Sequence, residues 1–339
     1  MEKILTIKDV AKKANVSIST VSRVLNNKTR VDIKTREKIL RIIKEMNYEP
    51  NNIARSLSRK KTNTIGVIVE DIVNPFFSEV AKGIEETLHK KGYTMILTNS
   101  NYNPDEELEL TKMLLRYKVD GIIITPVDEN SKSIELLKAR ETPFIVMNCI
   151  SKRNEFSWIS SDNLKGGYIA TKYLLELGHK KIMHIKGINI QASFERYEGF
   201  KNAIREKGLK LANQIVIGPA KTHKDAHDEM KKFIEKNGLK FFPTAIFAIN
   251  DDVAIGALDI LNEYGIKVPD DISIIGYDDI KIASYYPISL TTIKQPKYKM
   301  GEIAAKQLLI KIEKEEIDII NHFLTEPKLI IRNSCKELI

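Results

Sequence analysis

Short β-rich runs alternate with amphipathic helical stretches along most of this chain, and this alternation limits its fold more than any other feature. The first series of runs comprises TIGVIVED, YTMILTNSN, GIIITP and PFIVMN, separated by helical stretches at about 75–91, 104–118 and 130–140. A second series begins with WISSD and continues with KIMHIKG, QIVIGPA, TAIFAIN and ISIIGYDD. Such alternation predicts an α/β fold with two doubly wound subdomains, each a parallel sheet covered by helices on both faces.

Polar side chains follow many of the expected strands. Because ligands of open α/β sheets bind at the carboxyl ends of the strands, facing strand ends in two subdomains would form a cleft. Hydrogen-bonding groups with a few aromatic rings suit a small, hydroxyl-rich ligand better than an apolar one. The expected lining comprises Asp71, Asn74, Asn99, Ser100, Asn101, Thr125 and Asn148 in the first series, Asp162, Asn250, Asp251, Asp278 and Asp279 in the second, and the rings of Phe76, Phe77 and Phe247.

Ahead of these series, residues 6–25 (TIKDVAKKANVSISTVSRVL) have the pattern of two short helices joined by a tight turn. Thr6, with Asp9 three positions later, predicts a capped start for the first helix. Asn15 tolerates the left-handed backbone of a turn, and Ser17 is expected to cap the second helix. Residues pointing inward would be Val10, Ala11, Ala14, Val21, Val24 and Leu25, while Ile18, Ser19, Ser22 and Arg23 form an outward face that can enter a DNA major groove.

Charge supports a nucleic-acid role for this N-terminal segment. Residues 1–61 hold 16 Lys and Arg against 6 Asp and Glu, a net charge of +10, whereas residues 62–339 hold 38 against 39. A basic excess confined to one segment favours a polyanionic partner. A membrane surface is the competing polyanion, but no Trp or Phe precedes Phe76 to anchor a membrane helix.

A third helix is expected from Asp32 to about Asn47, closing a small helical domain. The basic segment 48–64 follows, with Pro50 and one short apolar-spaced turn at 53–57. Two interpretations of it remain open. It is either a flexible basic linker, or a segment that folds on DNA and inserts Leu57 into the minor groove.

The composition is that of a cytoplasmic protein. The N-terminus lacks the pattern of a signal peptide, and no apolar stretch approaches the length of a membrane span. The two cysteines, Cys149 and Cys335, lie far apart and are expected to be reduced.

Enzyme classes find little support in the sequence. The nucleophile elbow, the phosphate-binding loop and the dinucleotide fingerprint are all absent. His223 and His227 have a spacing that one helix face could present to a metal, but a zinc site needs further ligands. We therefore expect no metal and no cofactor.

Over essentially its full length the chain resembles the lac repressor/gal repressor (LacI/GalR) family of bacterial transcription regulators. The N-terminal block matches the family's DNA-binding headpiece, and NYEPNNIARSL resembles its hinge helix. The segments GHKKIMHIKG, ERYEGF, FAINDDVAIGAL, IIGYDDIKIASYYPISLTTIKQP and PKLIIRNS follow in the family's order. The resemblance implies two subdomains of periplasmic-binding-protein type, a homodimer on a palindromic double-stranded DNA operator, and a small effector that alters operator binding.

The resemblance also implies roles for individual residues. Ile18 stands where other members often carry Tyr or another base-reading residue, so the resemblance does not imply an operator sequence. Asn15 stands where many members have Gly, and we expect the turn to tolerate it. In the cleft, Arg196, Asn250, Asp278 and Gln295 match effector contacts, joining the predicted effector residues Asp71, Asn74, Phe76, Asn99, Thr125 and Asn148. The residues expected at DNA are Thr6, Ser17, Ile18, Ser19, Thr20, Ser22, Arg23, Asn26, Asn51, Ala54 and Leu57.

These observations predict a headpiece at residues 1–49, a hinge at 50–61 and an effector-binding and dimerisation domain at 62–339. Within that domain, one subdomain would comprise about 62–160 plus 293–325, and the other about 161–292 plus 326–339. The leading interpretation is a repressor controlled by a sugar or sugar derivative. A purine or a protein corepressor as the controlling partner, and a sugar-binding protein that does not bind DNA, are the alternatives.

Overall fold

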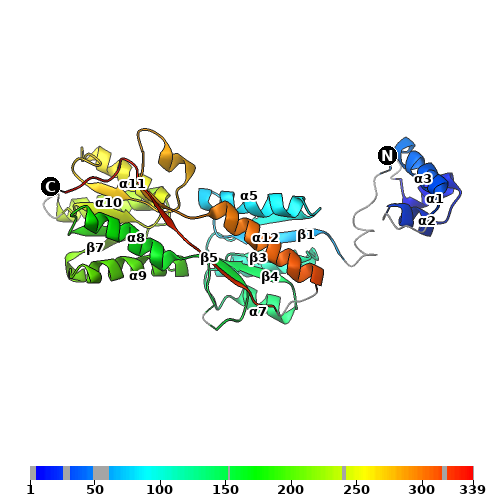
Figure 1. The fold of residues 1–339 in the computed structure, drawn as a ribbon, viewed down its shortest axis with the longest axis horizontal. Helices are drawn as coiled ribbons and strands as arrows, with labels where there is room; N and C mark the ends of the chain where they lie inside the picture. Colours follow the sequence, from blue (N-terminus) through cyan, green and yellow to red (C-terminus); the bar gives the residue numbers. More distant parts are fainter. Residues whose placement is uncertain are drawn as a thin grey trace. The chain divides into compact units, whose positions relative to one another are not determined.

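The computed structural model describes residues 5–25, 31–48, 61–151, 153–238, 242–314 and 319–338. It divides into two compact units, residues 1–63 and 64–339. The first unit contains the expected helices α1 (Ile7–Ala14), α2 (Ile18–Leu25) and α3 (Ile33–Glu45). These three helices, labelled in Figure 1, pack around a small core formed by Val10, Ala11, Ala14, Val21, Val24, Ile39, Ile42 and Tyr48.

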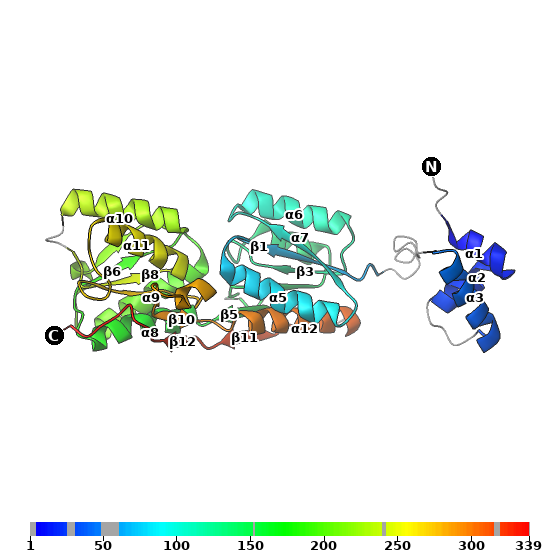
Figure 2. The ribbon, with the colours of Figure 1, turned by 90° about the horizontal axis from the view of Figure 1, so that it is seen from above.

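A six-stranded parallel sheet forms the centre of what we call the first lobe. Its strand order is β11-β5-β4-β3-β1-β2. The helices α5 (Pro75–His89) and α12 (Lys297–Lys314) cover one face, and α6 (Pro104–Arg116) and α7 (Lys132–Ala139) cover the other (Figure 2). The strands are β1 (Thr64–Val69), β2 (Thr94–Asn99), β3 (Gly121–Ile124), β4 (Phe144–Met147), β5 (Trp158–Ser161) and β11 (His322–Thr325).

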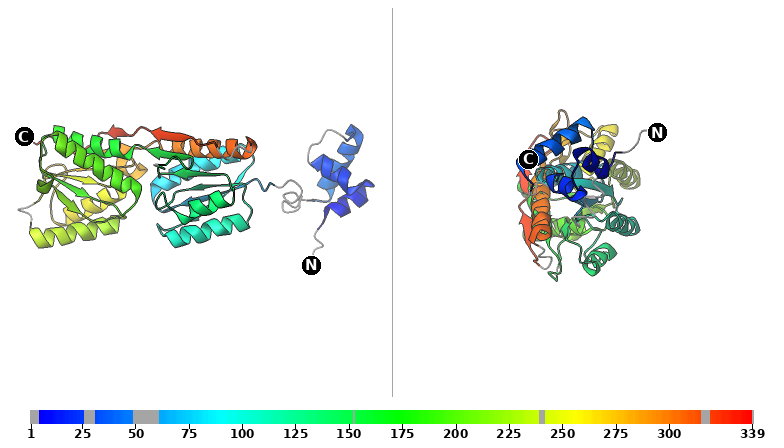
Figure 3. Two further views of the ribbon diagram at one scale, coloured as in Figure 1. Left: turned by 90° about the horizontal axis from the view of Figure 1, so that it is seen from below. Right: turned by 90° about the vertical axis from the view of Figure 1, so that its right-hand side faces the viewer.

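A four-stranded parallel sheet, in the order β7-β6-β8-β9, forms the centre of the second lobe. The helices α8 (Asn163–Glu176) and α9 (Gln191–Glu206) cover one face, and α10 (His223–Asn237) and α11 (Asp251–Glu263) cover the other (Figure 3). The strands are β6 (Ile182–Ile185), β7 (Ile215–Ile217), β8 (Ala245–Ala248) and β9 (Ser273–Ile275), and a separate antiparallel pair joins β10 (Thr292–Lys294) to β12 (Lys328–Ile330).

The doubly wound α/β architecture is therefore confirmed, but one strand was grouped with the wrong series. The run WISSD forms β5, which pairs with β4 and β11 in the first sheet. Hydrophobic pattern identifies a strand but not its partner, and β11 reaches β5 only because the chain returns after α12. No helix in the described ranges combines the length and hydrophobicity needed to cross a membrane.

Candidate functional site

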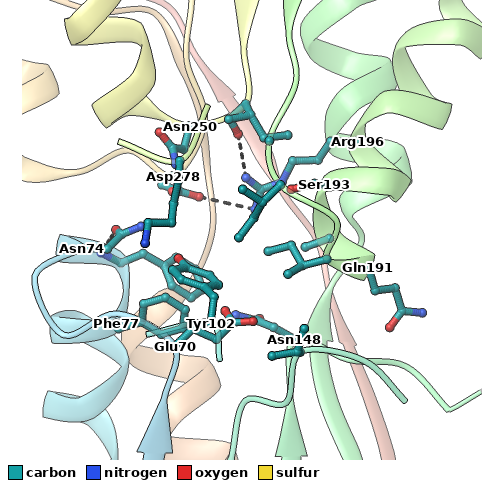
Figure 4. Close-up of a pocket in the computed structure, with 18 of the residues that line it drawn as sticks. Glu70, Asn74, Phe77, Tyr102, Asn148, Gln191, Ser193, Arg196, Asn250 and Asp278 are labelled. Atoms are coloured by element: carbon teal, nitrogen blue, oxygen red, sulfur yellow. Dashed lines mark hydrogen bonds and ion pairs between the residues drawn. The ribbon is translucent and has the colours of Figure 1, made fainter. Parts of the chain in front are cut away.

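A cavity of about 60 Å³ lies where the carboxyl ends of strands from both lobes face each other (Figure 4). Each lobe supplies residues that follow a strand or begin the next helix. The first lobe contributes Glu70, Asn74, Phe76, Phe77, Tyr102, Pro126, Val127 and Asn148. The second contributes Gly187, Ile188, Ile190, Gln191, Ala192, Ser193, Arg196, Ala220, Lys221, Ile249, Asn250 and Asp278.

Arg196 is held at the cavity by contacts from several elements. Its Nε donates to Asn163 Oδ1 (3.0 Å) and its Nη1 to the Ile249 carbonyl (2.7 Å). Nη2 lies 3.6 Å from Asp278 Oδ1, and the guanidinium sits 3.7 Å from the centre of the Tyr277 ring. The side chain is therefore fixed inside the second lobe and is not a surface ion-pair partner.

Asp278 is fixed from the opposite direction. Its Oδ1 accepts a hydrogen bond from Gln295 Nε2 (2.6 Å), and its carbonyl accepts one from Lys297 Nζ (2.6 Å). Burial raises the pKa of Asp278, although Arg196 and Lys297 act to lower it. The neighbouring Asp279 does not line the cavity; its carboxylate pairs with Arg332 (2.5 Å).

Three asparagines supply further polar groups to the lining. Asn74 and Asn250 are N-caps of α5 and α11, and each uses Oδ1 to accept a backbone N–H, from Phe76 (2.9 Å) and Val253 (2.8 Å). Their Nδ2 groups make no hydrogen bond within the described ranges, so both remain donors for a ligand. Asn148 has φ 55°, a left-handed conformation that asparagine tolerates.

Contacts between the two lobes surround the cavity. Gln191 Oε1 accepts from the backbone N–H of Ile150 (2.7 Å), and Gln191 Nε2 donates to the Ile150 carbonyl (3.3 Å). Lys221 Nζ lies 4.8 Å from the centre of the Tyr102 ring, within the range of a cation–π interaction. These contacts hold the two lobes close together over the cavity.

The cavity gathers six of the ten predicted effector residues: Asn74, Phe76, Asn148, Arg196, Asn250 and Asp278. The other four do not line it. Asp71 caps the loop after β1, Thr125 donates back to the Ile68 carbonyl, and Gln295 orients Asp278. Asn99 accepts from the backbone of Ile72 (3.0 Å). The expectation that Phe247 lines the cleft is wrong, because it is fully buried and packs against His184.

Five lining residues with polar groups were missed: Glu70, Tyr102, Gln191, Ser193 and Lys221. Glu70 directly follows β1, so the rule about strand ends could have identified it. Tyr102 and Lys221 follow β2 and β7 within a few residues. Gln191 and Ser193 begin α9, where no pattern separates a ligand contact from an ordinary helix start.

The helices of the first unit present the predicted outward face. Asp9 accepts hydrogen bonds from the backbone N–H and the hydroxyl of Thr6 (2.9 and 2.7 Å), so the capped start of α1 is confirmed. Asn15 has φ 52°, and Ser17 Oγ accepts from the backbone of Thr20 (3.2 Å). Of the residues predicted at DNA, Ser17, Ile18, Ser19 and Arg23 are exposed, Thr20 and Ser22 are half-buried, and Asn26, Asn51, Ala54 and Leu57 lie outside the described residues.

The histidines of α10 pair with carboxylates of α11. His223 Nε2 lies 2.6 Å from Asp259, and His227 Nε2 lies 3.0 Å from Glu263. In the described ranges, no three His, Cys, Asp or Glu residues are arranged to hold a metal ion. Hydrogen bonding to Glu263 raises the pKa of His227.

Two family models together account for most of the chain. The model for bacterial regulatory proteins of the lacI family matches residues 6–51, and the model for periplasmic binding proteins and the sugar-binding domain of the LacI family matches residues 62–331. The chain belongs to the LacI family. It is therefore a DNA-binding transcriptional regulator with a small-molecule effector, and not an enzyme.

Individual LacI-family proteins resemble the chain over nearly its whole length. The HTH-type transcriptional repressor PurR of Haemophilus influenzae (strain PittEE) is 38% identical, covering 98% of this chain and 99% of that protein. A lac repressor dimer bound to operator and the anti-inducer ONPF superposes with a TM-score of 0.87 at 25% sequence identity. The match covers 98% of this chain and 100% of that chain. A LacI-family regulator from Enterococcus faecium with bound ribose superposes with a TM-score of 0.73 at 33% sequence identity. The match covers 81% of this chain and 100% of that chain.

Proposed function

We propose that this chain is a homodimeric, cytoplasmic repressor of a palindromic operator, and that a small sugar in the cavity between the lobes controls its affinity for DNA. The observation that supports a sugar as the ligand is that the aromatic and the polar lining residues come from different lobes. Its phenyl and phenol rings, Phe76, Phe77 and Tyr102, all come from the first lobe. The second lobe opposes them with Arg196, Asn250 and Asp278.

This division matches the two kinds of surface on a sugar. One apolar face of a sugar ring can lie on an aromatic side chain, while its hydroxyls each donate and accept. Arg196 offers donors, Asp278 offers acceptors and Asn250 offers a donor amide, so together they complement adjacent hydroxyls. The Enterococcus faecium regulator holding ribose, at 33% identity, adds support.

A purine is the second candidate, favoured by the three aromatic rings. A planar base stacks on such rings, but its other face would meet aliphatic side chains, Ile188, Ile190 and Ala192. Its edge would then depend on the same few hydrogen-bonding groups. The arrangement therefore favours a sugar over a base.

The position of the cavity suggests how a ligand is coupled to DNA. Residues of both lobes line it, so a bound ligand contacts both lobes and its affinity depends on their relative position. A change in the lobes of both subunits would alter the spacing of two headpieces on their half-sites. The ligand then shifts the population of two quaternary states for which it has different affinities.

A thermal-shift screen of ribose and other sugars, sugar phosphates and purines tests the ligand class. A ligand present at about a hundredfold its Kd should stabilise the protein by about 2.7 kcal/mol. Stabilisation by a sugar together with a change in operator affinity would support the proposal. Stabilisation by purines alone would replace the sugar by the second candidate.

A further inference from the structure

Glu70 differs from the other buried carboxylates of the second unit. It directly follows β1, is 4% exposed and lines the cavity. The carboxylates of Glu107, Asp251 and Asp278 are equally buried, and each accepts hydrogen bonds from the protein. Within the described ranges, no hydrogen bond or salt bridge reaches the Glu70 carboxyl group.

A carboxyl group that is largely withdrawn from solvent costs free energy unless it finds a hydrogen-bond partner, and for Glu70 that partner has to come from the cavity that it lines. In Figure 4, Glu70 lies with Phe77, Tyr102 and Asn148 along one side of the pocket, facing Arg196 and Asp278. The carboxyl group therefore faces the space that the effector would occupy. A ligand there can supply the hydrogen bond that the protein does not.

The charges around Glu70 indicate which ligand group would suit it. Glu107 on α6 and the adjacent Asp71 are negative neighbours, and Tyr102 and Cys149 are further titratable groups close by. Arg196 and Lys221 are the positive groups of the lining; the guanidinium is already engaged within the second lobe, and the Lys221 ammonium lies over the Tyr102 ring. An anionic ligand group beside Glu70 would be repelled by Glu107 and Asp71, whereas a hydroxyl would not.

We propose that Glu70 contacts the effector directly, with its carboxyl group hydrogen-bonding a hydroxyl group of an uncharged ligand. This inference rests on the proposed function, because it takes the cavity to be the effector site. Glu70 is then a specificity-determining residue of this chain, and its proton makes the effector response depend on pH.

The direction of that dependence follows from burial. Burial, reinforced by Glu107, raises the pKa of Glu70 to about 8. The carboxyl group is thus neutral at pH 7, and a bound ligand that excludes water favours the neutral form further. If the complex requires this proton, affinity falls by about tenfold for each pH unit above the pKa of the free protein.

The experiment measures binding of D-ribose to the full chain by calorimetry from about pH 6.5 to about pH 9.5, a range that spans this titration. Glu70→Gln keeps a donor and an acceptor but cannot titrate, and Glu70→Ala removes both. Glu85→Gln, an exposed carboxyl-to-amide change on α5, is the matched control. We expect wild type and Glu85→Gln to lose affinity above about pH 8, Glu70→Gln to bind with a flat profile, and Glu70→Ala to bind at least about tenfold more weakly.

Three outcomes would overturn the assignment: affinity that rises with pH, Glu70→Ala binding as tightly as wild type, or Glu70→Gln following the wild-type profile. The last would assign the titration to Glu107, whose pKa burial also raises. If ribose does not bind wild type, ribose is not the effector, and unfolding without ligand still decides the role of Glu70.

The second measurement is unfolding without ligand, in which titration of Glu70 changes the stability of the protein. Because the folded state holds the Glu70 proton up to about pH 8, wild-type stability declines as the pH rises from about 4.5 through that value. Glu70→Gln escapes the decline, so it should melt at a higher temperature than wild type at alkaline pH. Lower stability of Glu70→Gln at both acidic and alkaline pH would show that the carboxyl group has a structural partner, which overturns the proposal.

Discussion

Asp278 has a backbone conformation that few residues other than glycine adopt. Its φ is 109°, and a conformation of this kind costs about 1–3 kcal/mol. Its N–H donates to the Ile293 carbonyl (2.7 Å), while Lys297 and Gln295 bind its carbonyl and its carboxylate. These bonds hold the carboxylate opposite Arg196 before any ligand arrives, which reduces the ordering cost of binding.

Replacing Arg196 by Lys tests the other half of this pair. Lysine keeps the charge but cannot reproduce the planar fork that reaches Asn163, Ile249 and Asp278 together. We expect effector affinity to fall by at least tenfold, about 1.4 kcal/mol, in a calorimetric titration. Operator affinity without effector should stay within about threefold, or about 0.7 kcal/mol, of wild type.

Arg205→Lys is the matched control, because this exposed arginine lies on the same helix, away from the cavity. It should leave effector affinity unchanged. Equal losses in the two variants would mean that Arg196 supports α9 and does not act on the ligand.

The rule that residues after strand ends line the cleft identified some residues of the site and failed for others, and the structure gives the reasons. Asn250 and Asp278 follow β8 and β9, where the chain leaves the sheet and side chains face the cleft. Phe247 lies inside β8, so its side chain points into the layer between sheet and helices. Glu70 directly follows β1 and satisfies the same rule, but the sequence does not show the burial that distinguishes it from a solvated glutamate.

The sequence predicted the boundaries of helices more accurately than the pairing of strands. The three helices expected at about 75–91, 104–118 and 130–140 appear at Pro75–His89, Pro104–Arg116 and Lys132–Ala139, each with a side-chain cap at its start. Hydrogen bonds from a capping side chain to nearby backbone N–H groups determine where such a helix begins, and these are visible in the local sequence. The partner of β5 depends on β11, more than 150 residues further along, which no local pattern encodes.

At the level of α2, Arg23→Ala tests the DNA-binding face. Arg23 is exposed in the last turn of the helix, beside the small polar residues Ser19 and Ser22. If it contacts bases, its loss should cost about 1–3 kcal/mol of operator affinity and relax specificity at one position. Lys38→Ala, an exposed cation of α3, removes the same charge and serves as control. Equal weakening on specific and random DNA would assign Arg23 to the phosphate backbone.

Lys297, at the start of α12, connects the two lobes through one side chain. It is 3% exposed, and its Nζ binds the carbonyls of Asp278 (2.6 Å) and Asp279 (2.8 Å) and the carboxylate of Glu79 (3.1 Å). Because Glu79 belongs to α5 of the first lobe and the carbonyls to the second, we expect this contact to transmit movement between them.

Lys297→Met keeps the length of the side chain but leaves buried carbonyls unpaired, at a cost of about 1–3 kcal/mol in unfolding free energy. The ratio of operator affinities with and without effector should move towards one, while the effector still binds. Lys299→Met, which removes only the exposed pair with Glu302, should leave that ratio intact. A normal ratio in Lys297→Met would show that coupling runs elsewhere.

For the whole molecule, the second unit contains every residue of the cavity, and the predicted DNA-binding face of α2 lies in the first. The chain passes between the lobes after β5, after β10 and after β11, so any relative movement of the lobes acts through three connections. Binding and response are therefore separable: a fragment of residues 62–339 should bind effector but give no operator-linked change.

Thermodynamic reciprocity makes this separation measurable. If ribose changes operator affinity by some factor, operator DNA must change ribose affinity by the same factor, typically about 5–150-fold for coupled sites. We expect titrations of the full chain with ribose, with and without saturating operator, to differ by that factor. The 62–339 fragment should give one ribose affinity under both conditions, because it lacks the headpiece. If operator leaves the ribose affinity of the full chain unchanged while ribose alters operator binding at equilibrium, ribose would be acting at a site other than this cavity or on a different assembly state.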